Sequence, residues 1–218
     1  MGYGPRMRPP RPQPPNRDQI AALPPFEGLA LPQIERIATA DAAEQAGAWL
    51  AQQRWLGFDT ESKPTFSVGE VSTGPHTLQL ATLERAWVFQ LHDPHCRHVA
   101  AQLMATDTVT KVGFGLSGDR SQMRTRLSIE PLSLLDLDAV FKQRGYTQSI
   151  GVKTAVAIVF GQRFSKSRKQ TTSNWASRTL SEGQLRYAAN DAWAALRVAH
   201  ALGLTDAVRT AASSSGQR

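Results

Sequence analysis

The sequence is poor in cysteine, with only Cys96 among its 218 residues. A single cysteine excludes an intrachain disulfide and a cysteine-based zinc site. No apolar run approaches the roughly 18 residues that a membrane-spanning helix needs, and the amino-terminus carries no apolar stretch of the secretory type. We therefore expect an intracellular, cytoplasmic protein that is soluble and does not bind membranes.

Acidic residues are fewer than basic ones. Asp and Glu number 18 against 25 Lys and Arg, so the formal charge is +7 and the pI about 10.1. A basic surface suits a polyanionic ligand such as nucleic acid, although generic soluble basic proteins share this composition. Hydrophobic residues make up 41% of the chain, which is enough for a real core. Composition identifies no protein partner.

Proline is concentrated at one end of the chain. Residues 1–25 hold eight of the thirteen prolines together with four arginines, and such a segment has few backbone donors and little apolar surface to bury. We predict a disordered Pro/Arg-rich tail over residues 1–25, one folded domain over residues 26–206 and a flexible carboxyl-terminal tail over residues 207–218.

Strand and helix patterns alternate along the rest of the chain. Short apolar runs predict strands, and apolar periodicity behind capping residues such as Asp41 and Asp93 predicts helices. We expect strands at 55–60, 77–83, 86–91, 109–113 and 132–137. We expect helices at 41–53, 93–105, 138–144, 149–160 and 181–203, and one more that follows Asp119 and reaches about residue 126. This order predicts an α/β fold with a mixed sheet covered by helices on both faces.

Two carboxylates end the first of these strands, in Leu56-Gly57-Phe58-Asp59-Thr60-Glu61. Residues i and i+2 of a strand project from the same face, so Asp59 and Glu61 stand side by side. Adjacent like charges raise each other's pKa unless a cation neutralises them. The pair predicts a site for Mg²⁺ or Mn²⁺, and a solvated turn is the alternative.

A third carboxylate, Asp119, follows a glycine-rich segment at the start of a predicted helix. The helix dipole stabilises a negative charge there, with or without a function. Gly113, Gly115 and Gly118 also fit the dinucleotide-binding fingerprint, with Asp138 lying 20 residues beyond the last glycine. That alternative is weakened because Asp119 itself would face a bound pyrophosphate with a like charge.

The last predicted helix carries Tyr187 and Asp191. Their spacing of four residues places both side chains on one helix face. Asp191 precedes the apolar run 192–196, where a carboxylate is costly unless it is paired or bound to a metal. A surface aspartate beside a partly buried tyrosine is the alternative.

Taken together, three motifs resemble those of the DEDDy 3′–5′ exonucleases of the ribonuclease-H-like superfamily. The motifs are Phe58-Asp59-Thr60-Glu61, the segment Gly113–Asp119, and Tyr187-x-x-x-Asp191. Within this family, the block from Ser173-Asn174-Trp175 to Ala192 is most similar to exonuclease domains of the Werner syndrome helicase type. The resemblance covers about residues 40–204 and implies a ribonuclease-H-like fold with a mixed five- to six-stranded sheet.

The resemblance also implies a mechanism. Two ions of Mg²⁺ or Mn²⁺ would activate a water molecule and stabilise the leaving oxygen. Asp59 would bridge the ions, Glu61 and Asp191 would bind one of them, and Asp119 would bind the other. The catalytic set is completed by the hydroxyl of Tyr187, which would orient the water rather than act as a base, because a free tyrosine has a pKa near 10.

Substrate contacts are expected from six further residues. These are Thr60, Phe114, Leu116, Lys166, Arg168 and Trp175. Lys166 and Arg168 belong to the basic run 163–169, which suits phosphates but also suits a solvated loop. For Phe114, Leu116 and Trp175, packing in the core is the alternative.

Two other clusters have simpler interpretations. The segment His92–His98 is rich in possible zinc ligands, but helix capping already explains its Asp93-Pro94 pair. Asp136 and Asp138 are expected to be a strand end and a helix cap.

The leading hypothesis is therefore a metal-dependent exonuclease that removes nucleoside 5′-monophosphates from DNA 3′ ends. The alternative substrate is RNA, trimmed at its 3′ end as by ribonuclease D. Two further hypotheses from other classes are a non-catalytic nucleic-acid-binding module and a dinucleotide-binding oxidoreductase that uses the glycine-rich segment.

Overall fold

The computed structural model describes residues 11–65 and 69–206. Six strands in these residues form one sheet in the order β1-β4-β3-β2-β5-β6. β3 runs antiparallel to β2 and to β4, while the other neighbouring strands are parallel. The strands are β1 (Ile34–Ile37), β2 (Trp55–Glu61), β3 (Thr77–Ala81), β4 (Ala86–Gln90), β5 (Thr110–Gly113) and β6 (Leu134–Asp136). The predicted mixed sheet is confirmed.

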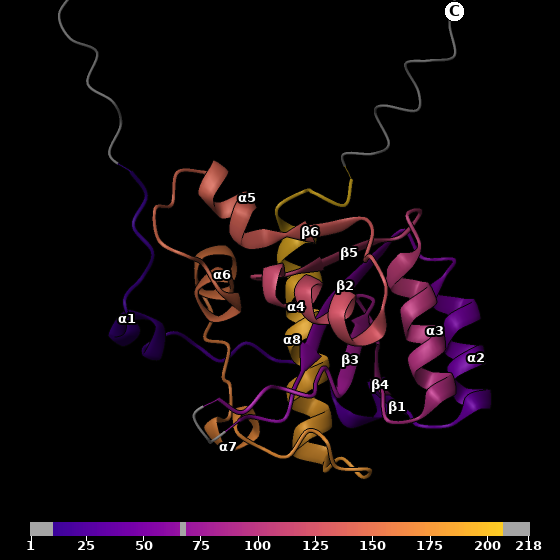
Figure 1. Cartoon of the computed structure of the whole chain (residues 1–218). Helices are drawn as coiled ribbons and strands as arrows, with labels where there is room; N and C mark the ends of the chain where they lie inside the picture. Colours follow the sequence, from indigo (N-terminus) through magenta and orange to yellow (C-terminus); the bar gives the residue numbers. More distant parts are fainter. Residues whose placement is uncertain (1–10, 66–68, 207–218) are drawn as a thin grey trace, which may run out of the picture.

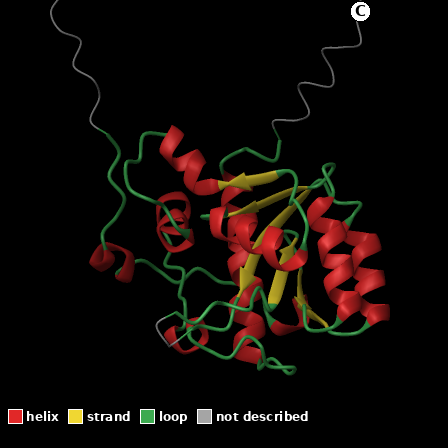
Figure 2. Ribbon diagram, in the orientation of Figure 1, coloured by secondary structure: helices red, strands yellow, loops and turns green. Residues whose placement is uncertain are grey.

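Helices cover both faces of the sheet (Figures 1 and 2). One face packs against α2 (Ala40–Leu50), α3 (Pro94–Ala105) and α4 (Ser117–Gln122), which continues as a π-helical turn over Met123–Leu127. The other face packs against α6 (Val152–Phe160) and α8 (Glu182–Ala201). Shorter helices are α1 (Arg17–Ala21), α5 (Leu137–Gln143) and α7 (Arg168–Thr171). In the described part of the chain, the helices are too short or too polar to cross a membrane.

Strand β2 lies between the two helical layers and divides its side chains between them. Leu56 and Phe58 are buried in the core cluster under α2 and α3. The alternate position, Gly57, faces α8. Because side chains alternate along a strand, Asp59 and Glu61 continue on the side of α8.

Helix α8 crosses β2 at very short range. A Cβ atom added to Gly57 would lie 1.9 Å from the carbonyl oxygen of Ala192 and 3.1 Å from Cβ of Leu196. The helix meets the sheet through small buried residues, including Ala188, Ala189, Ala192 and Ala195. The close approach requires a glycine in the strand and small side chains on the helix, and it brings the middle of α8 beside the end of β2.

The segment before residue 26 is more ordered than the sequence predicts. Asn16 and Gln19 form a reciprocal capping box that starts α1, and such a box satisfies two backbone donors. The amide of Arg163 donates to the carbonyl of Pro24 over 2.7 Å, and the amide of Phe26 donates to Arg163 over 2.9 Å. The expectation of disorder is therefore wrong for residues 16–25, while the tails at 1–10 and 207–218 lie outside the described residues.

Several element boundaries also differ from expectation. β1 and α7 lie at residues 34–37 and 168–171, where no strand or helix was predicted. Helix α2 is capped by Thr39, which accepts from the amide of Ala42, and not by Asp41. Asp93 does cap α3, as predicted, by accepting from the amide of Cys96 over 2.9 Å.

Gly57→Ala tests the contact between β2 and α8. We expect a loss of about 3 kcal/mol in the free energy of unfolding, because backbone in the helix must move to admit the methyl group. Urea unfolding followed by circular dichroism measures this change. The matched control is Gly118→Ala, where a Cβ meets nothing within 4 Å and alanine favours the helix by roughly 0.5–1 kcal/mol. Equal stability of the two variants would contradict the packing.

Candidate active site

Three carboxylates meet where β2 ends against α8. Asp59, Glu61 and Asp191 each offer an oxygen, and these oxygens all lie within 4.8 Å of one another. Asp191 is 4% exposed, while the two strand residues are partly buried. Within residues 11–65 and 69–206, this is the one group of three or more acidic, histidine or cysteine side chains that could hold a metal ion. Hard oxygen ligands at this separation suit a divalent cation.

Burial and mutual repulsion make it unfavourable for these carboxylates to be charged. Burial raises the pKa of Glu61 to about 8, and repulsion by Asp191 is the second cause. Burial also holds the pKa of Asp59 well above its usual range, followed by repulsion from Asp191 and Glu61. Burial raises the pKa of Asp191 to about 6, against the attraction of Lys166. A bound cation would relieve the repulsion and lower all three pKa values.

Asp119 stands beside this group without joining it. It lies in the first turn of α4, and its carboxylate accepts a hydrogen bond from the hydroxyl of Thr60. Burial raises its pKa, whereas the bond from Thr60 lowers it. Asp119 also adds to the repulsion on Asp59. A fourth carboxylate is thus close to the group, anchored by the residue between the two acids of β2.

Lys166 supplies a positive charge to the group from the connection between α6 and α7. Its Nζ lies 2.5 Å from Oδ2 of Asp191 and 5.2 Å from the ring centre of Tyr187. The pKa of Lys166 is raised because attraction to Asp191 and Asp59 outweighs burial. Lys166 was expected to contact substrate from its place in a basic run, but its pairing with Asp191 was not foreseen.

Tyr187 faces the carboxylates from one turn earlier on α8. Its hydroxyl lies 3.0 Å from Oγ1 of Thr171, and its ring centre lies 5.8 Å from that of Trp175. The pKa of Tyr187 is raised, mainly by burial. The hydroxyl is therefore protonated at neutral pH and held in position. Thr171 is a further site residue that was not predicted, because a threonine just after a basic run gives no signal.

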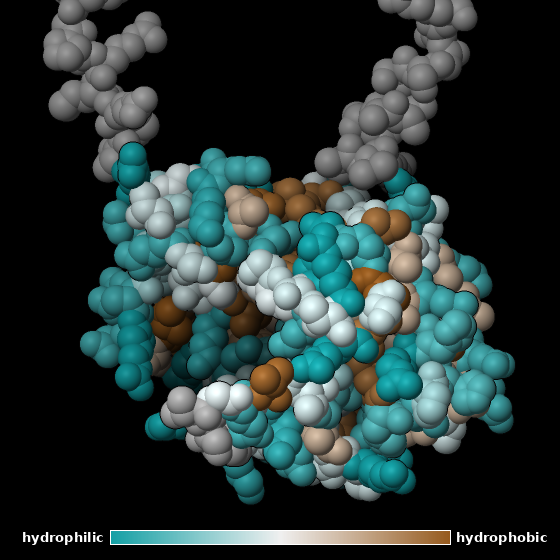
Figure 3. All heavy atoms as spheres, in the orientation of Figure 1, coloured by the Kyte–Doolittle hydropathy of each residue, from teal (hydrophilic) through white to brown (hydrophobic). Residues whose placement is uncertain are grey.

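A hollow of about 380 Å³ opens beside Lys166, Tyr187 and Asp191. In Figure 3 the surface is hollowed between the segments of α6 and α7 on this face. Its wall combines basic groups with the rings of Phe26 and Phe164. The site is therefore reachable from solvent.

The other residues expected to contact substrate differ in how far their side chains are exposed. Leu116 is 3% exposed and Trp175 is 1% exposed, so each side chain packs in the core, as the alternative held, and substrate contact by either stays a prediction. Trp175 supports the ring of Tyr187. Phe114 is partly buried and Arg168 is exposed.

The dinucleotide alternative does not agree with the glycine-rich segment. The amides of Gly115 and Leu116 donate to the carboxylate of Asp136 over 2.9 and 3.0 Å. The donors that would meet a phosphate are therefore used by an internal carboxylate. Asp136 also caps α5 by accepting from the amide of Asp138, so the cap expected at Asp138 is at Asp136.

The zinc alternative at residues 92–98 is also unsupported. Cys96 is buried, and its Sγ lies 3.6 Å from the carbonyl oxygen of Thr39. Burial raises the pKa of this thiol to about 12, and a thiol that stays protonated is a poor metal ligand. Asp93 is occupied as the cap of α3.

Comparison with known proteins agrees with this geometry. Residues 34–205 match the family model described as 3′-5′ exonuclease. The chain is 31% identical over 178 residues to an exonuclease mut-7 homolog of Aedes aegypti, covering 70% of this chain and 24% of that protein. It is 26% identical over 151 residues to the bifunctional 3′-5′ exonuclease/ATP-dependent helicase WRN of Mus musculus, covering 68% and 11%. A solved structure of Trypanosoma brucei RNase D in complex with RNA superimposes with a TM-score of 0.67 at 20% identity, covering 85% of this chain and 64% of that chain.

The mixed six-stranded sheet with helices on both faces is the fold that this chain shares with the RNase D structure. The chain belongs to the 3′-5′ exonuclease family, whose members are hydrolases that act on nucleic acid. The predicted resemblance to this family, including WRN, is confirmed. The chain spans about a quarter or less of the length of these two curated relatives.

The raised pKa of Glu61 predicts how metal-free stability depends on pH. Between pH 4.5 and about 8, Glu61 is protonated in the native state and ionised in the unfolded state. The contribution of Glu61 to the free energy of unfolding should therefore fall as pH rises through this window. Urea unfolding in EDTA measures it as the difference between the wild type and Glu61→Gln.

The difference is needed because His76 has the opposite effect. Burial lowers the pKa of His76, so the contribution of His76 to the free energy of unfolding grows as pH rises toward 6.5. This contribution is the same in the wild type and in Glu61→Gln, and it cancels in the difference. Saturating Mn²⁺ should abolish the decline in the wild type. A difference that stays constant from pH 4.5 to 8 in EDTA would contradict the electrostatics of the site.

Proposed function

We propose that this chain is a metal-dependent 3′–5′ exonuclease that releases nucleoside 5′-monophosphates from nucleic-acid 3′ ends. The observation that supports it most is the group formed by Asp59, Glu61 and Asp191, whose oxygens lie within 4.8 Å of one another. Asp119 is adjacent, and the family model extends over residues 34–205. Carboxylates in this arrangement fit divalent cations, and Mg²⁺ or Mn²⁺ are the ions we propose.

The chain's own residues divide the work. Asp59, Glu61 and Asp191 would hold the cations, with Asp119 completing the set. When bound, two divalent ions promote ionisation of a water and stabilise the leaving oxygen of an in-line displacement. Glu61 would also contact the terminal 3′-hydroxyl.

Tyr187 would orient the attacking water. Its raised pKa keeps the hydroxyl protonated at neutral pH, so it acts as a hydrogen-bonding group and not as a base. The contact with Thr171 restrains that hydroxyl. Lys166, which already lies among the carboxylates, would attract a substrate phosphate into the site.

Two substrates are proposed, and different relatives favour them. DNA is our first expectation, which rests on the resemblance to the WRN-type exonuclease domain. RNA is favoured by the likeness in fold to an RNase D that was solved with RNA. The ratio of kcat/KM for DNA and RNA oligonucleotides of identical sequence decides between them.

Asp59→Asn tests the carboxylate group. We expect loss of the product ladder from a 5′-labelled oligonucleotide in Mn²⁺, a fall of at least about 100-fold in rate, because a central cation ligand is removed. Denaturing gels of a time course measure it. Asp41→Asn removes an exposed carboxylate from α2 and should leave the rate unchanged. An intact ladder in Asp59→Asn would sink the proposal.

Tyr187→Phe tests the water-positioning role. We expect kcat to fall by about 100-fold, within the usual range for a positioned proton-transfer or hydrogen-bonding group, while Mn²⁺ affinity and KM change little. Tyr146→Phe is the matched control, since Tyr146 packs on Phe141 near α5. Single-turnover rates separate the chemical step from product release. Equal rates in the two variants would remove Tyr187 from the mechanism.

A further inference from the structure

A groove runs between α3 and the π-helical turn Met123–Leu127 that continues α4. It consists of a hollow of about 240 Å³ beside the ends of β3 and β4, and a hollow of about 650 Å³ along α3. Arg97, Arg126 and Leu127 line both hollows, so the two adjoin, and we call them together the α3 groove. Figure 1 shows α3 next to this turn.

The described lining of the α3 groove has only one sign of charge. Its polar members include Arg97 and Arg126 with His76, His92 and His98, and no Asp or Glu lines either hollow. By contrast, the hollow beside α8 is lined by Asp191, and the hollow near the start of β2 is lined by Glu84 and Asp206. Such a one-signed lining raises the local concentration of anions.

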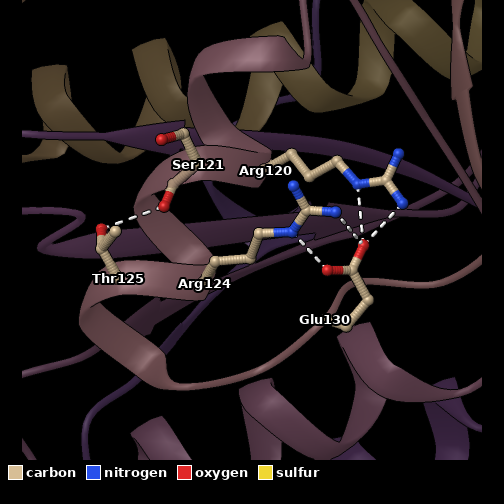
Figure 4. A network of polar contacts seen from close by, with 5 residues as sticks. All are labelled: Arg120, Ser121, Arg124, Thr125 and Glu130. Carbon is tan, nitrogen blue, oxygen red and sulfur yellow. Dashed lines mark hydrogen bonds and ion pairs between the residues drawn. The ribbon is translucent and has the colours of Figure 1, made fainter.

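Arg126 differs from Arg120 and Arg124, the other arginines of α4 and its π-helical turn. Arg120 and Arg124 are both paired with Glu130, which compensates part of their charge (Figure 4). Arg126 donates to the backbone carbonyl of Ser72 over 2.7 Å and makes no ion pair with a described residue. Arg97 is exposed in the first turns of α3 and likewise makes no such pair. Both guanidinium groups have donors left for a phosphate.

The groove begins next to the proposed active site. The backbone amide of His76 donates to the backbone carbonyl of Glu61 over 2.9 Å, so this lining residue pairs with the strand that carries the site. Trp175 lines the first hollow and contacts the ring of Tyr187. These two contacts place the basic lining of the groove beside residues that flank the proposed active site.

We propose that the α3 groove binds the phosphate backbone of single-stranded nucleic acid several nucleotides before the 3′ end. This inference rests on the proposed function and adds the path of the substrate strand. Arg97 and Arg126 contact phosphates, while apolar wall residues such as Leu127 and Ile129 contact bases that a single strand leaves exposed. The histidine-rich segment 92–98 then serves nucleic acid and not zinc.

Direct binding in EDTA tests the groove without hydrolysis. The probes are 5′-fluorescein-labelled oligothymidylate and oligouridylate of twelve nucleotides, followed by fluorescence anisotropy at several salt concentrations. The proteins are the full chain, Arg97→Gln, Arg126→Gln and the double variant. Arg97→Lys keeps the charge, and Arg36→Gln removes an exposed arginine from edge strand β1.

Each lost phosphate contact should lower the slope of log K against log salt by about 0.7 and weaken binding about 5-fold at 0.1 M salt. The double variant should lose about 25-fold, with Arg97→Lys and Arg36→Gln close to the wild type. Arg97→Gln disturbs no described hydrogen bond, so it reports on binding even if Arg126→Gln alters the fold.

Three results would contradict the proposed role of the groove. They are an affinity and a salt slope in Arg97→Gln and Arg126→Gln equal to those of the wild type, an equal loss of affinity in Arg36→Gln, or no binding by the wild type. Failure of the proposed function is separate from these. If the wild type binds through Arg97 and Arg126 but yields no ladder in Mn²⁺, the proposed exonuclease activity is rejected and the proposed binding role of the groove is retained.

Discussion

The close crossing of α8 over β2 is the contact on which the site depends. Gly57 has no side chain, so the backbone of Ala192 can lie against the strand at a distance that any Cβ would prevent. Asp191 precedes Ala192, and Asp59 lies two residues beyond Gly57 on the same face. The helix that completes the core behind the sheet therefore also delivers a carboxylate to the end of the strand. Tyr187 follows from the same contact, because it lies one turn earlier on the same side of α8.

This proximity makes the uncharged or cation-bound state of the site the favourable one. Like charges in a partly buried setting repel, and the pKa values of Asp59 and Glu61 rise in consequence. Lys166 compensates part of this charge through its ion pair with Asp191. Removing one member of a buried pair leaves the other uncompensated, which commonly costs about 3–5 kcal/mol. The same arrangement thus explains both the attraction for cations and the presence of a lysine among the carboxylates.

The sequence predicted the parts of this site that follow from local geometry. Strand alternation places Asp59 beside Glu61, and helical spacing places Tyr187 beside Asp191. The cap at Asp93 follows from the Asp93-Pro94 pair, and its carboxylate accepts from the amide of Cys96. What was missed depends on contacts between distant segments. The Lys166–Asp191 pair joins residues 25 positions apart in sequence, and Thr60 meets Asp119 across 59 positions. The burial of Leu116 and Trp175 depends on the assembled core, so an apolar residue near a motif could not be separated from a base-stacking one. Strand β1 was missed because its short segment pairs with β4, which follows it by about 50 positions.

Carboxylates from β2 and α8 are expected to bind divalent ions together. The most direct measurement is Mn²⁺ binding followed by the electron paramagnetic resonance signal of the free ion at neutral pH. The wild type should bind Mn²⁺ saturably, and Asp191→Asn, which leaves β2 intact, should lose most of that affinity. If Asp191→Asn remained folded and bound Mn²⁺ as the wild type does, the crossing of α8 over β2 would not make a metal site and the account would be contradicted.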